Sequence, residues 1–360
     1  MATHFHRLKI RDIRKETADC VSIAFEVPAE YSEEFRFIQG QNITVRIYDE
    51  AEEIRRSYSI CSSPLDGELR IAVKMIEKGR FSAYAYKLRS GDELEILPPT
   101  GNFFTALNPV LKKNYVAFVA GSGITPVISI IKTTLASEQD STFTLIYGNK
   151  NRHSIIFREE LEGLKNRYMN RFSLYHVLSQ EETDAGINHG RIDPEKCESF
   201  QGLTGLLGAD DFFICGPESM IYAVRGWLES RGIEKKKIHY ELFTIPGETV
   251  KTGEVSVIKT GTANSGHTSH VTIRQDGISF QFDLPFEGES ILNAATQRGV
   301  DLPFSCKGGV CSTCRAMLVE GQVEMVHNYA LEQDELDRGF ILTCQSHPRS
   351  EKLFIDFDLK

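Results

Sequence analysis

The sequence is poor in the features that mark membrane, exported and nucleic-acid-binding proteins. No apolar run approaches the roughly 20 residues that a transmembrane helix needs, and residues 1–7 contain no apolar signal region. Positive charge is not in excess, because 41 Lys and Arg stand against 50 Asp and Glu. We therefore expect a cytoplasmic protein with neither a membrane nor a nucleic acid as partner.

Four of the eight cysteines have no framework spacing. Cys20, Cys61, Cys197 and Cys215 are scattered, as expected for reduced thiols in a reducing compartment. The sequence therefore predicts no disulfide bonds.

The other four cysteines have the spacing of a plant-type 2Fe-2S ligand set, C-x4-C-x2-C followed by a fourth thirty residues later. Gly308 and Gly309 lie in the short loop, where glycine allows backbone conformations closed to other residues and leaves amides free to point at sulfur. A structural zinc site is the alternative, but zinc ribbons usually pair two C-x2-C hooks and only one is present. The pattern predicts one-electron transfer. The expected ligands are Cys306, Cys311, Cys314 and Cys344.

The pattern of apolar residues changes three times along the 360 residues, a length that suggests two or three domains. Short alternating runs up to about residue 100 predict an antiparallel barrel. Apolar strands that alternate with helical periods from about residue 113 predict a parallel sheet with right-handed crossovers. A stretch rich in Gly, Thr, Ser and Lys then predicts a tether. The expected boundaries are 1–108, 109–242, 243–267 for the tether, and 268–360.

The last segment is acidic, with 8 Lys and Arg against 14 Asp and Glu, a net charge of −6 over residues 268–360. Such a surface would dock on a basic partner, although solvation alone also explains it.

Two glycine turns mark the expected parallel sheet. Ala120-Gly-Ser-Gly-Ile-Thr-Pro126 joins a buried strand to a helix, where glycines let the backbone approach a pyrophosphate and the helix dipole favours negative charge. Cys215-Gly-Pro-Glu-Ser-Met220 repeats the arrangement after a later strand. The two loops should therefore lie together at the carboxyl edge of the sheet. A plain strand-to-helix turn is the alternative for either motif.

The barrel sequence contains a second candidate nucleotide site. In Arg56-Ser-Tyr-Ser59 the alternation places Arg56 and Tyr58 on one face, and a guanidinium suits a phosphate while an aromatic ring stacks on a heterocycle. Downstream, Lys74 leads to Gly79 and Ser82, a possible phosphate cradle ahead of a helix over 83–88. Ser82 could equally be a helix N-cap.

In this order, Arg56-x-Tyr58-Ser59, Gly79-x-x-Ser82, Gly121-x-Gly123-x-x-Pro126 and Cys215-Gly-Pro217 resemble the plant-type ferredoxin-NADP reductase superfamily. With the cysteine set added, the chain resembles a single-chain oxygenase reductase with a carboxyl-terminal 2Fe-2S ferredoxin. The sequence, including His239-Tyr-Glu-Leu-Phe243, is most similar to the reductase subunits of ring-1,2-phenylacetyl-CoA epoxidases. Reductases for ring-hydroxylating dioxygenases and acyl desaturases share the layout.

The resemblance implies an FAD-binding β-barrel, a Rossmann-like NAD(P)-binding α/β domain and an α+β, β-grasp ferredoxin domain. It also implies electron flow from NAD(P)H through FAD and the cluster to the oxygenase component of a multicomponent system. In such a reductase Arg56 would hold the FAD pyrophosphate, Tyr58 would stack on the isoalloxazine, Ser59 would lie near N5, and Lys74, Gly79 and Ser82 would surround the phosphates. Gly121, Gly123, Gly216 and Pro217 would form the dinucleotide loops, and Thr125 and Cys215 would flank the nicotinamide. Family members end in an aromatic residue that covers the flavin, whereas this chain continues; Phe243 is the candidate cover, with a place in the linker core as the alternative.

The choice of nicotinamide rests on basic residues near the sheet edge. Arg152 and Arg191 favour the 2′-phosphate of NADPH, whereas an NADH site is expected to present a carboxylate to the ribose. We expect NADPH, with NADH possible because Glu181 and Glu182 lie nearby. A function of another class, a non-catalytic iron-sulfur sensor or assembly factor, would not need two nucleotide-binding domains.

Overall fold

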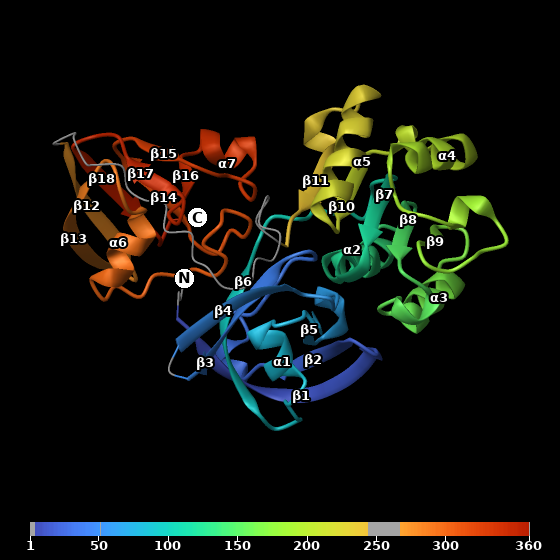
Figure 1. The fold of residues 1–360 in the computed structure, drawn as a ribbon, viewed down its shortest axis with the longest axis horizontal. Coiled ribbons are helices and arrows are strands. Elements are labelled where there is room, and N and C mark those ends of the chain that lie inside the picture. Colours follow the sequence, from blue (N-terminus) through green and yellow to red (C-terminus); the bar gives the residue numbers. More distant parts are fainter. Residues whose placement is uncertain (1–3, 51, 244–266, 360) are drawn as a thin grey trace.

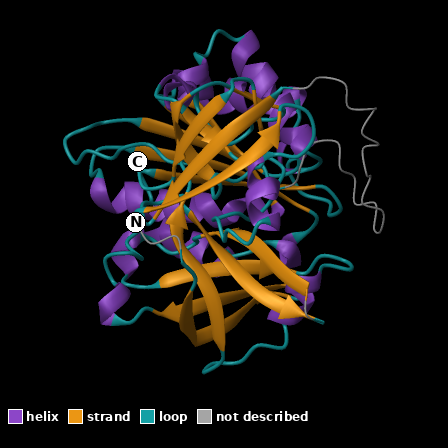
Figure 2. Ribbon diagram, turned by 90° about the vertical axis from the view of Figure 1, so that its left-hand side faces the viewer, coloured by secondary structure: helices purple, strands orange, loops and turns teal. Residues whose placement is uncertain are grey.

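The computed structural model describes residues 4–50, 52–243 and 267–359. Two lobes lie above a barrel, with the α/β domain on one side and the domain that carries the four clustered cysteines, here called the cluster domain, on the other (Figure 1). In the view turned by 90° the two upper lobes overlap above the barrel strands (Figure 2). The expected tether lies almost wholly outside the described residues. No helix in the described ranges is long and apolar enough to cross a bilayer.

The barrel domain is a six-stranded antiparallel sheet in the order β4-β3-β6-β1-β2-β5. A bridge between Ile60 and Ile71 joins its two edges and closes it. Ile43 and Val45, which alternate along β3, are fully buried in its core, so the barrel prediction is confirmed. The elements are β1 (His6–Thr17), β2 (Cys20–Glu26), β3 (Asn42–Asp49), β4 (Glu52–Ser59), β5 (Leu69–Lys74), α1 (Arg80–Ala85) and β6 (Glu93–Thr100).

The α/β domain is a parallel sheet in the order β11-β10-β7-β8-β9, with helices on both faces. Helices α2 and α3 pack on one face, α4 and α5 on the other. The order reverses between β7 and β10, and ligands of open parallel sheets bind at such a switch point. The elements are β7 (Asn114–Ala120), α2 (Ile124–Ser137), β8 (Thr142–Asn149), α3 (Arg158–Arg167), β9 (Phe172–Leu178), α4 (Pro194–Thr204), β10 (Asp211–Cys215), α5 (Glu218–Ser230) and β11 (Ile238–Glu241).

The cluster domain has a mixed sheet in the order β13-β12-β18-β14-β16, plus the pair β15-β17. Strands β12 and β18 pair in parallel, and α6 buries its apolar face against the sheet. This is the α+β fold expected from the resemblance. The elements are β12 (Thr268–Gln275), β13 (Ile278–Pro285), α6 (Ile291–Gln297), β14 (Arg315–Glu320), β15 (Val323–Met325), α7 (Gln333–Asp337), β16 (Phe340–Leu342), β17 (Ser346–Pro348) and β18 (Lys352–Asp356).

Helix α2 is hydrogen-bonded to the barrel domain. The Ser129 hydroxyl donates to the carbonyl oxygen of Ser62 at 2.6 Å, and the hydroxyls of Ser63 and Thr133 lie 2.9 Å apart. All four side chains are buried, so these contacts are shielded from water and fix the two domains against each other.

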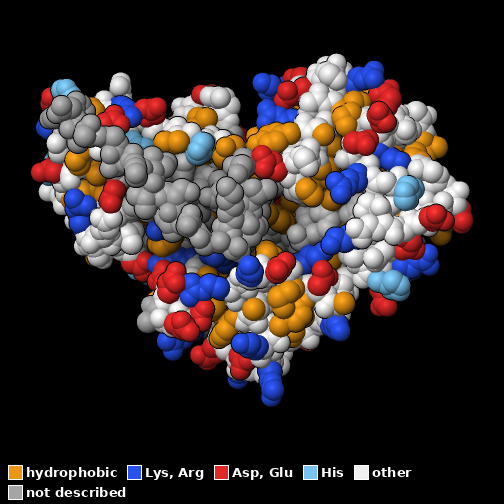
Figure 3. Space-filling view, viewed as in Figure 1, with side chains coloured by type: hydrophobic (Ala, Val, Ile, Leu, Met, Phe, Trp, Pro, Cys, Tyr) orange, Lys and Arg blue, Asp and Glu red, His pale blue; other side chains and the backbone are white. Residues whose placement is uncertain are grey.

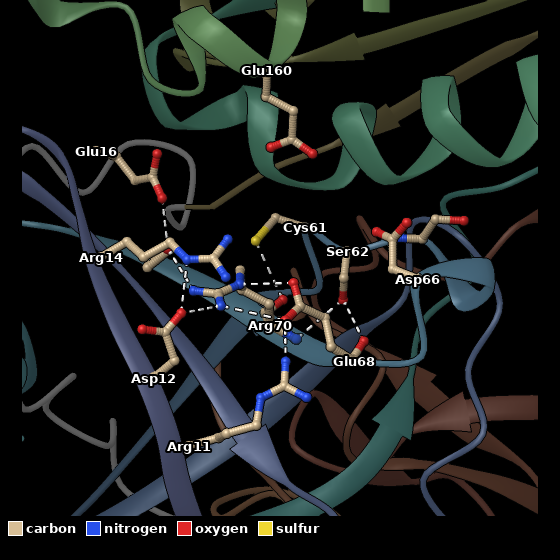
Figure 4. Close-up of polar contacts among 12 residues, drawn as sticks. Arg11, Asp12, Arg14, Glu16, Cys61, Ser62, Asp66, Glu68, Arg70 and Glu160 are labelled. Carbon is tan, nitrogen blue, oxygen red and sulfur yellow. Dashed lines mark hydrogen bonds and ion pairs between the residues drawn. The ribbon is translucent and has the colours of Figure 1, made fainter. Parts of the chain in front are cut away.

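A network around Arg70 supports the barrel side of this interface (Figure 4). Its guanidinium donates to Asp12 at 2.7 Å and to Glu68 at 3.0 Å. The Ser62 hydroxyl accepts from the Arg70 amide at 3.1 Å and donates to the Glu68 carbonyl at 2.8 Å. The hydrogen bond from Arg70 lowers the pKa of Asp12. The segment on which α2 rests is therefore rigidly held.

The cluster domain is seated against both other domains. Val310 and Tyr329 pack against the core of the α/β domain, and Asn102 of the barrel domain donates to Glu335 at 2.6 Å. A cavity of about 720 Å³ lies where the three domains meet. The space-filling view shows the molecule hollowed between the two upper lobes (Figure 3).

Candidate active site

The two glycine-bearing loops meet at the carboxyl ends of β7 and β10. Gly121 has a φ of 54° with open space where a side chain would be. A Cβ on Gly123 would lie 2.2 Å from the carbonyl oxygen of Cys215, so only glycine fits between the loops. Helix α2 begins at Ile124 and has no side-chain cap, and the Ile124 amide donates back to the carbonyl oxygens of Gly121 and Ser122. The predicted meeting of the two loops is therefore confirmed.

A cavity of about 700 Å³ opens beside these loops. Pro217, Lys74 and Phe243 reach it from three parts of the chain, and the Phe243 side chain is 42% exposed. Four of the lining residues are glycines, which let a ligand approach the backbone closely, as a dinucleotide site requires. The role of Phe243 as a flavin cover stays a prediction. The lining glycines are Gly121, Gly148, Gly190 and Gly216.

Thr125 and Cys215 do not line this cavity. The Thr125 hydroxyl donates to the Ser122 carbonyl at 3.0 Å, and the side chains of Thr125 and Cys215 are both buried. Burial, and then the charge of Glu241, raises the pKa of the Cys215 thiol well above its usual value, so the thiol stays protonated. Both residues shape the loops, and their role beside the nicotinamide stays a prediction.

The two basic residues expected at a 2′-phosphate differ in their surroundings. Arg191 lines the cavity, as does Lys150. Arg152 does not, because its guanidinium is paired with Glu181, which also accepts from the Arg152 amide at 2.8 Å. These hydrogen bonds lower the pKa of Glu181. Arg152 is thus engaged with Glu181 outside the cavity lining, whereas Arg191 lies in it.

The expected flavin residues lie on β4 in the predicted alternation. Arg56 is exposed, and its guanidinium donates only to the carbonyl oxygen of Arg55, at 2.7 Å, among the described contacts. The Tyr58 ring lies 5.2 Å from that of Phe81, and burial raises its pKa. A free cation beside an aromatic face fits the phosphate and ring system of FAD.

The segment predicted to cradle a phosphate, with Gly79 and Ser82, is arranged differently in the structure. Helix α1 begins at Arg80, so Ser82 lies in its first turn and Gly79 is the N-cap. The Ser82 hydroxyl accepts from the Ile76 amide at 3.2 Å and donates to the Gly79 carbonyl at 3.0 Å. Ser82 therefore holds the turn together, and backbone amides at the start of α1 are what remains for a phosphate. Lys74 forms an ion pair with Asp19 at 3.6 Å.

Glu241 is a site residue for which the sequence alone predicted no role. It ends β11, and its carboxylate accepts a hydrogen bond from the Ser59 hydroxyl at 3.0 Å. Burial raises its pKa to about 7. A hydroxyl bonded to a carboxyl with a pKa near neutrality is suited to proton transfer at physiological pH.

The same carboxyl should make stability depend on pH. Its pKa is raised from 4.5 to about 7 in the folded protein, so the folded state holds one more proton than the unfolded state between these values. As the pH rises from 4.5 to 7, the wild type should lose up to about 3 kcal/mol of unfolding free energy relative to Glu241→Gln. Urea unfolding of both proteins across this range measures the difference, and parallel curves would contradict the shift.

The four expected cluster ligands form two pairs. The Cys311 thiol donates to the Cys306 sulfur at 3.2 Å, and the neighbouring Cys314 thiol lowers the pKa of Cys344. No group of three or more His, Cys, Asp or Glu side chains in the described ranges is arranged to hold a single ion. Two pairs of thiols fit two irons, each with two thiolates, better than one zinc ion.

The backbone of the loop favours thiolates. The amide of Gly308 donates to the Cys306 sulfur at 3.3 Å. The hydrogen bond from the Cys311 thiol lowers the pKa of Cys306 to about 6, and hydrogen bonds from backbone amides act in the same direction. Left-handed backbone occurs at Lys307 and Gly309, with φ of 54° and 77°, and not at Gly308. Our expectation for Gly308 was wrong in that respect, while its amide does point at sulfur.

Family comparisons divide the chain in the same three parts. Residues 7–104 match the oxidoreductase FAD-binding domain. Residues 118–226 match the oxidoreductase NAD-binding domain. Residues 273–349 match the 2Fe-2S iron-sulfur cluster binding domain.

Relatives align from end to end. The chain is 44% identical over 360 residues to a component protein of the 1,2-phenylacetyl-CoA epoxidase of Escherichia coli K12, covering 99% of both chains. It is 30% identical to the ferredoxin reductase component of 3-ketosteroid-9-alpha-monooxygenase from Rhodococcus rhodochrous, covering 97% of this chain and 96% of the other. Among solved structures, phthalate dioxygenase reductase superimposes with a TM-score of 0.57 at 25% identity, covering 98% of both chains.

Proposed function

The chain belongs to the family of oxygenase reductases that combine FAD-binding, NAD-binding and 2Fe-2S domains, and on that premise we propose that it supplies electrons from NADPH to the oxygenase component of a phenylacetyl-CoA epoxidase. The likeness to the epoxidase protein of Escherichia coli extends over all three domains. A non-catalytic sensor would need neither the dinucleotide loops nor the flavin residues.

One observation carries the proposal: residues from all three domains line the cavity of about 720 Å³. Asn42 comes from the barrel domain, Glu241 from the α/β domain and Cys311 from the cluster domain. The three domains, which match FAD-binding, NAD-binding and 2Fe-2S families, thus meet around one cavity, and stepwise electron transfer requires such proximity.

NAD(P)H supplies a hydride to FAD, and the 2Fe-2S cluster lets its two electrons leave one at a time. The hydride also brings one proton, which has to be released for each NAD(P)H oxidised. Ser59 and Glu241 offer the route, because the hydroxyl is already bonded to a carboxylate. Glu241 lines the cavity between the domains, from which the proton reaches solvent.

The preference for NADPH rests on Arg191, with Lys150 beside it in the cavity. Arg191→Gln should raise the KM for NADPH roughly 10- to 100-fold and leave that for NADH nearly unchanged, because a charge-assisted hydrogen bond to a phosphate is lost. Steady-state kinetics with both nucleotides measure the ratio.

Arg152→Gln is the matched control. Its guanidinium is held by Glu181, so its loss should change the two KM values alike and by little. Equal effects of Arg191→Gln on both nucleotides would argue against a 2′-phosphate at this site.

The partner is tested by NADPH oxidation with purified oxygenase components. An epoxidase oxygenase supplied with phenylacetyl-CoA and O₂ should accelerate NADPH oxidation and form epoxide in proportion. Faster reduction of a ring-hydroxylating dioxygenase or an acyl desaturase would contradict the assignment of the partner, while leaving the reductase chemistry intact.

A further inference from the structure

The outer face of strands β3 and β4 is in contact with the cluster domain. Within the antiparallel pair, Val45 lies opposite Arg56, and Val45 is buried in the barrel core. The next pair, Arg46 and Arg55, faces the other way. Arg55 is 5% exposed, although it lies on the outside of the barrel. Another part of the protein must therefore cover it.

The cover is the segment that leads into the cysteine loop. The Arg55 guanidinium donates to the Asp301 carboxylate at 2.6 Å and to the Leu302 carbonyl at 3.1 Å. It also lies over the ring of Phe304, 4.0 Å from the centroid. Phe304 is two residues before the first expected ligand, Cys306. Arg55 of β4 thus contacts the segment that leads into the cysteine loop.

A second contact touches the other end of the same loop. The hydroxyls of Thr44 and Thr313 lie 3.2 Å apart, both buried, and Thr313 stands between Cys311 and Cys314. The Thr44 hydroxyl also lies 3.2 Å from that of Ser57, the residue opposite it on β4. The loop is therefore tied to β4 just before its first cysteine and to β3 between its second and third cysteines.

Arg55 is chemically suited to this position. A buried guanidinium is costly unless it is paired, and here it is paired on both sides, by Asp301 and by Glu53 of its own strand. Its planar fork bonds a carboxylate and a carbonyl while its face stacks on a ring, which a lysine cannot reproduce. Arginines that are buried at an interface are among the residues whose truncation most weakens it.

We propose that Arg55 is a positioning residue for internal electron transfer: it clamps the cysteine loop onto the outer face of β4, directly behind Arg56 and Tyr58. The inference rests on the proposed function. It adds that Arg55 fixes the cysteine loop on the face of β4 that also carries Ser59, the residue expected near the flavin N5. Arg55 lines neither cavity, so it should not affect nucleotide binding or hydride transfer.

Stopped-flow spectroscopy of the holoenzyme with NADPH tests the proposal, because flavin and cluster bleach at different wavelengths. Arg55→Gln should slow reduction of the cluster by the flavin roughly tenfold or more, since truncating one member of a buried charge pair is costly, while flavin reduction stays within about twofold. Arg36→Gln, which removes an exposed arginine paired with Glu33 in its own turn, should change neither step.

Hydrogen exchange of the oxidised protein gives a readout independent of activity. In Arg55→Gln the amides of 302–306 and 311–314 should exchange faster, with flavin and iron contents unchanged. Arg55→Lys and Asp301→Asn guard against a folding defect, because the Asp301 side chain is 64% exposed. Each should show a smaller change in the same direction, and Asp301→Asn should add little to Arg55→Gln.

If amide hydrogen exchange and reduction of the cluster by the flavin are as in the wild type in these variants, the clamp is wrong and the proposed function stands. If the wild type reduces its flavin but never its cluster, the proposed function and the clamp fall together.

Discussion

Replacing Cys311 by Ser should abolish electron delivery to a protein acceptor while leaving flavin reduction intact. Cys311 is paired with Cys306, so its loss removes one of the two thiolates that would bind one iron. Delivery should fall more than about a hundredfold, since even removing a hydrogen-bond partner of a metal ligand costs 10- to 100-fold. NADPH should still reduce a small dye at the wild-type rate, because the buried cores of the barrel and the adjoining face of the α/β domain contain no residue of the cluster domain.

Cys197→Ser is the control for this variant. Cys197 is buried in α4, far from the cysteine loop in sequence, and burial raises its pKa to about 12. It should keep the visible absorption of the cluster and the rate of delivery. Full delivery by the Cys311 variant without cluster absorption would refute the proposed electron path.

Glu241→Gln should slow turnover with a dye acceptor by about a hundredfold at pH 8, the range expected when a general base is removed. In the wild type the carboxyl must be ionised to take the proton, so turnover should rise as the pH passes through about 7, the pKa that burial imposes on Glu241. The variant should lose this limb of the profile. Steady-state rates between pH 5 and 9 measure both effects.

Glu234→Gln provides the comparison, because Glu234 lies shortly before β11 and pairs with Lys236 at the surface. Its profile should match that of the wild type. A Glu241 variant with an unchanged rate and an unchanged profile would show that the proton leaves by another route.

The parts that depend on local sequence could be predicted. Glycine at 121 and 123 and the four cysteines have requirements that few other residues meet, and both loops lie where the pattern places them. Helix α4 was missed because it buries only Cys197 and Phe200, too few apolar residues for a helical period.

The parts that depend on contacts between domains could not be predicted. Glu241 lies on a four-residue strand, and its meeting with Ser59 joins residues 182 positions apart. Arg55 looks no different from Arg56 in the sequence, yet one is covered by the cluster domain and the other is exposed. Arg152 has the charge that a phosphate needs, but its guanidinium is already paired with Glu181. A single sequence does not show such pairings.

Rapid-scan spectroscopy of the wild type, mixed with NADPH in the presence of an oxidised oxygenase component, tests the electron route most directly. The flavin absorption should fall first, the 2Fe-2S absorption second and that of the oxygenase component last, with two electrons delivered per NADPH. An oxygenase component that becomes reduced while the cluster stays oxidised throughout, in sub-stoichiometric NADPH, would contradict the route.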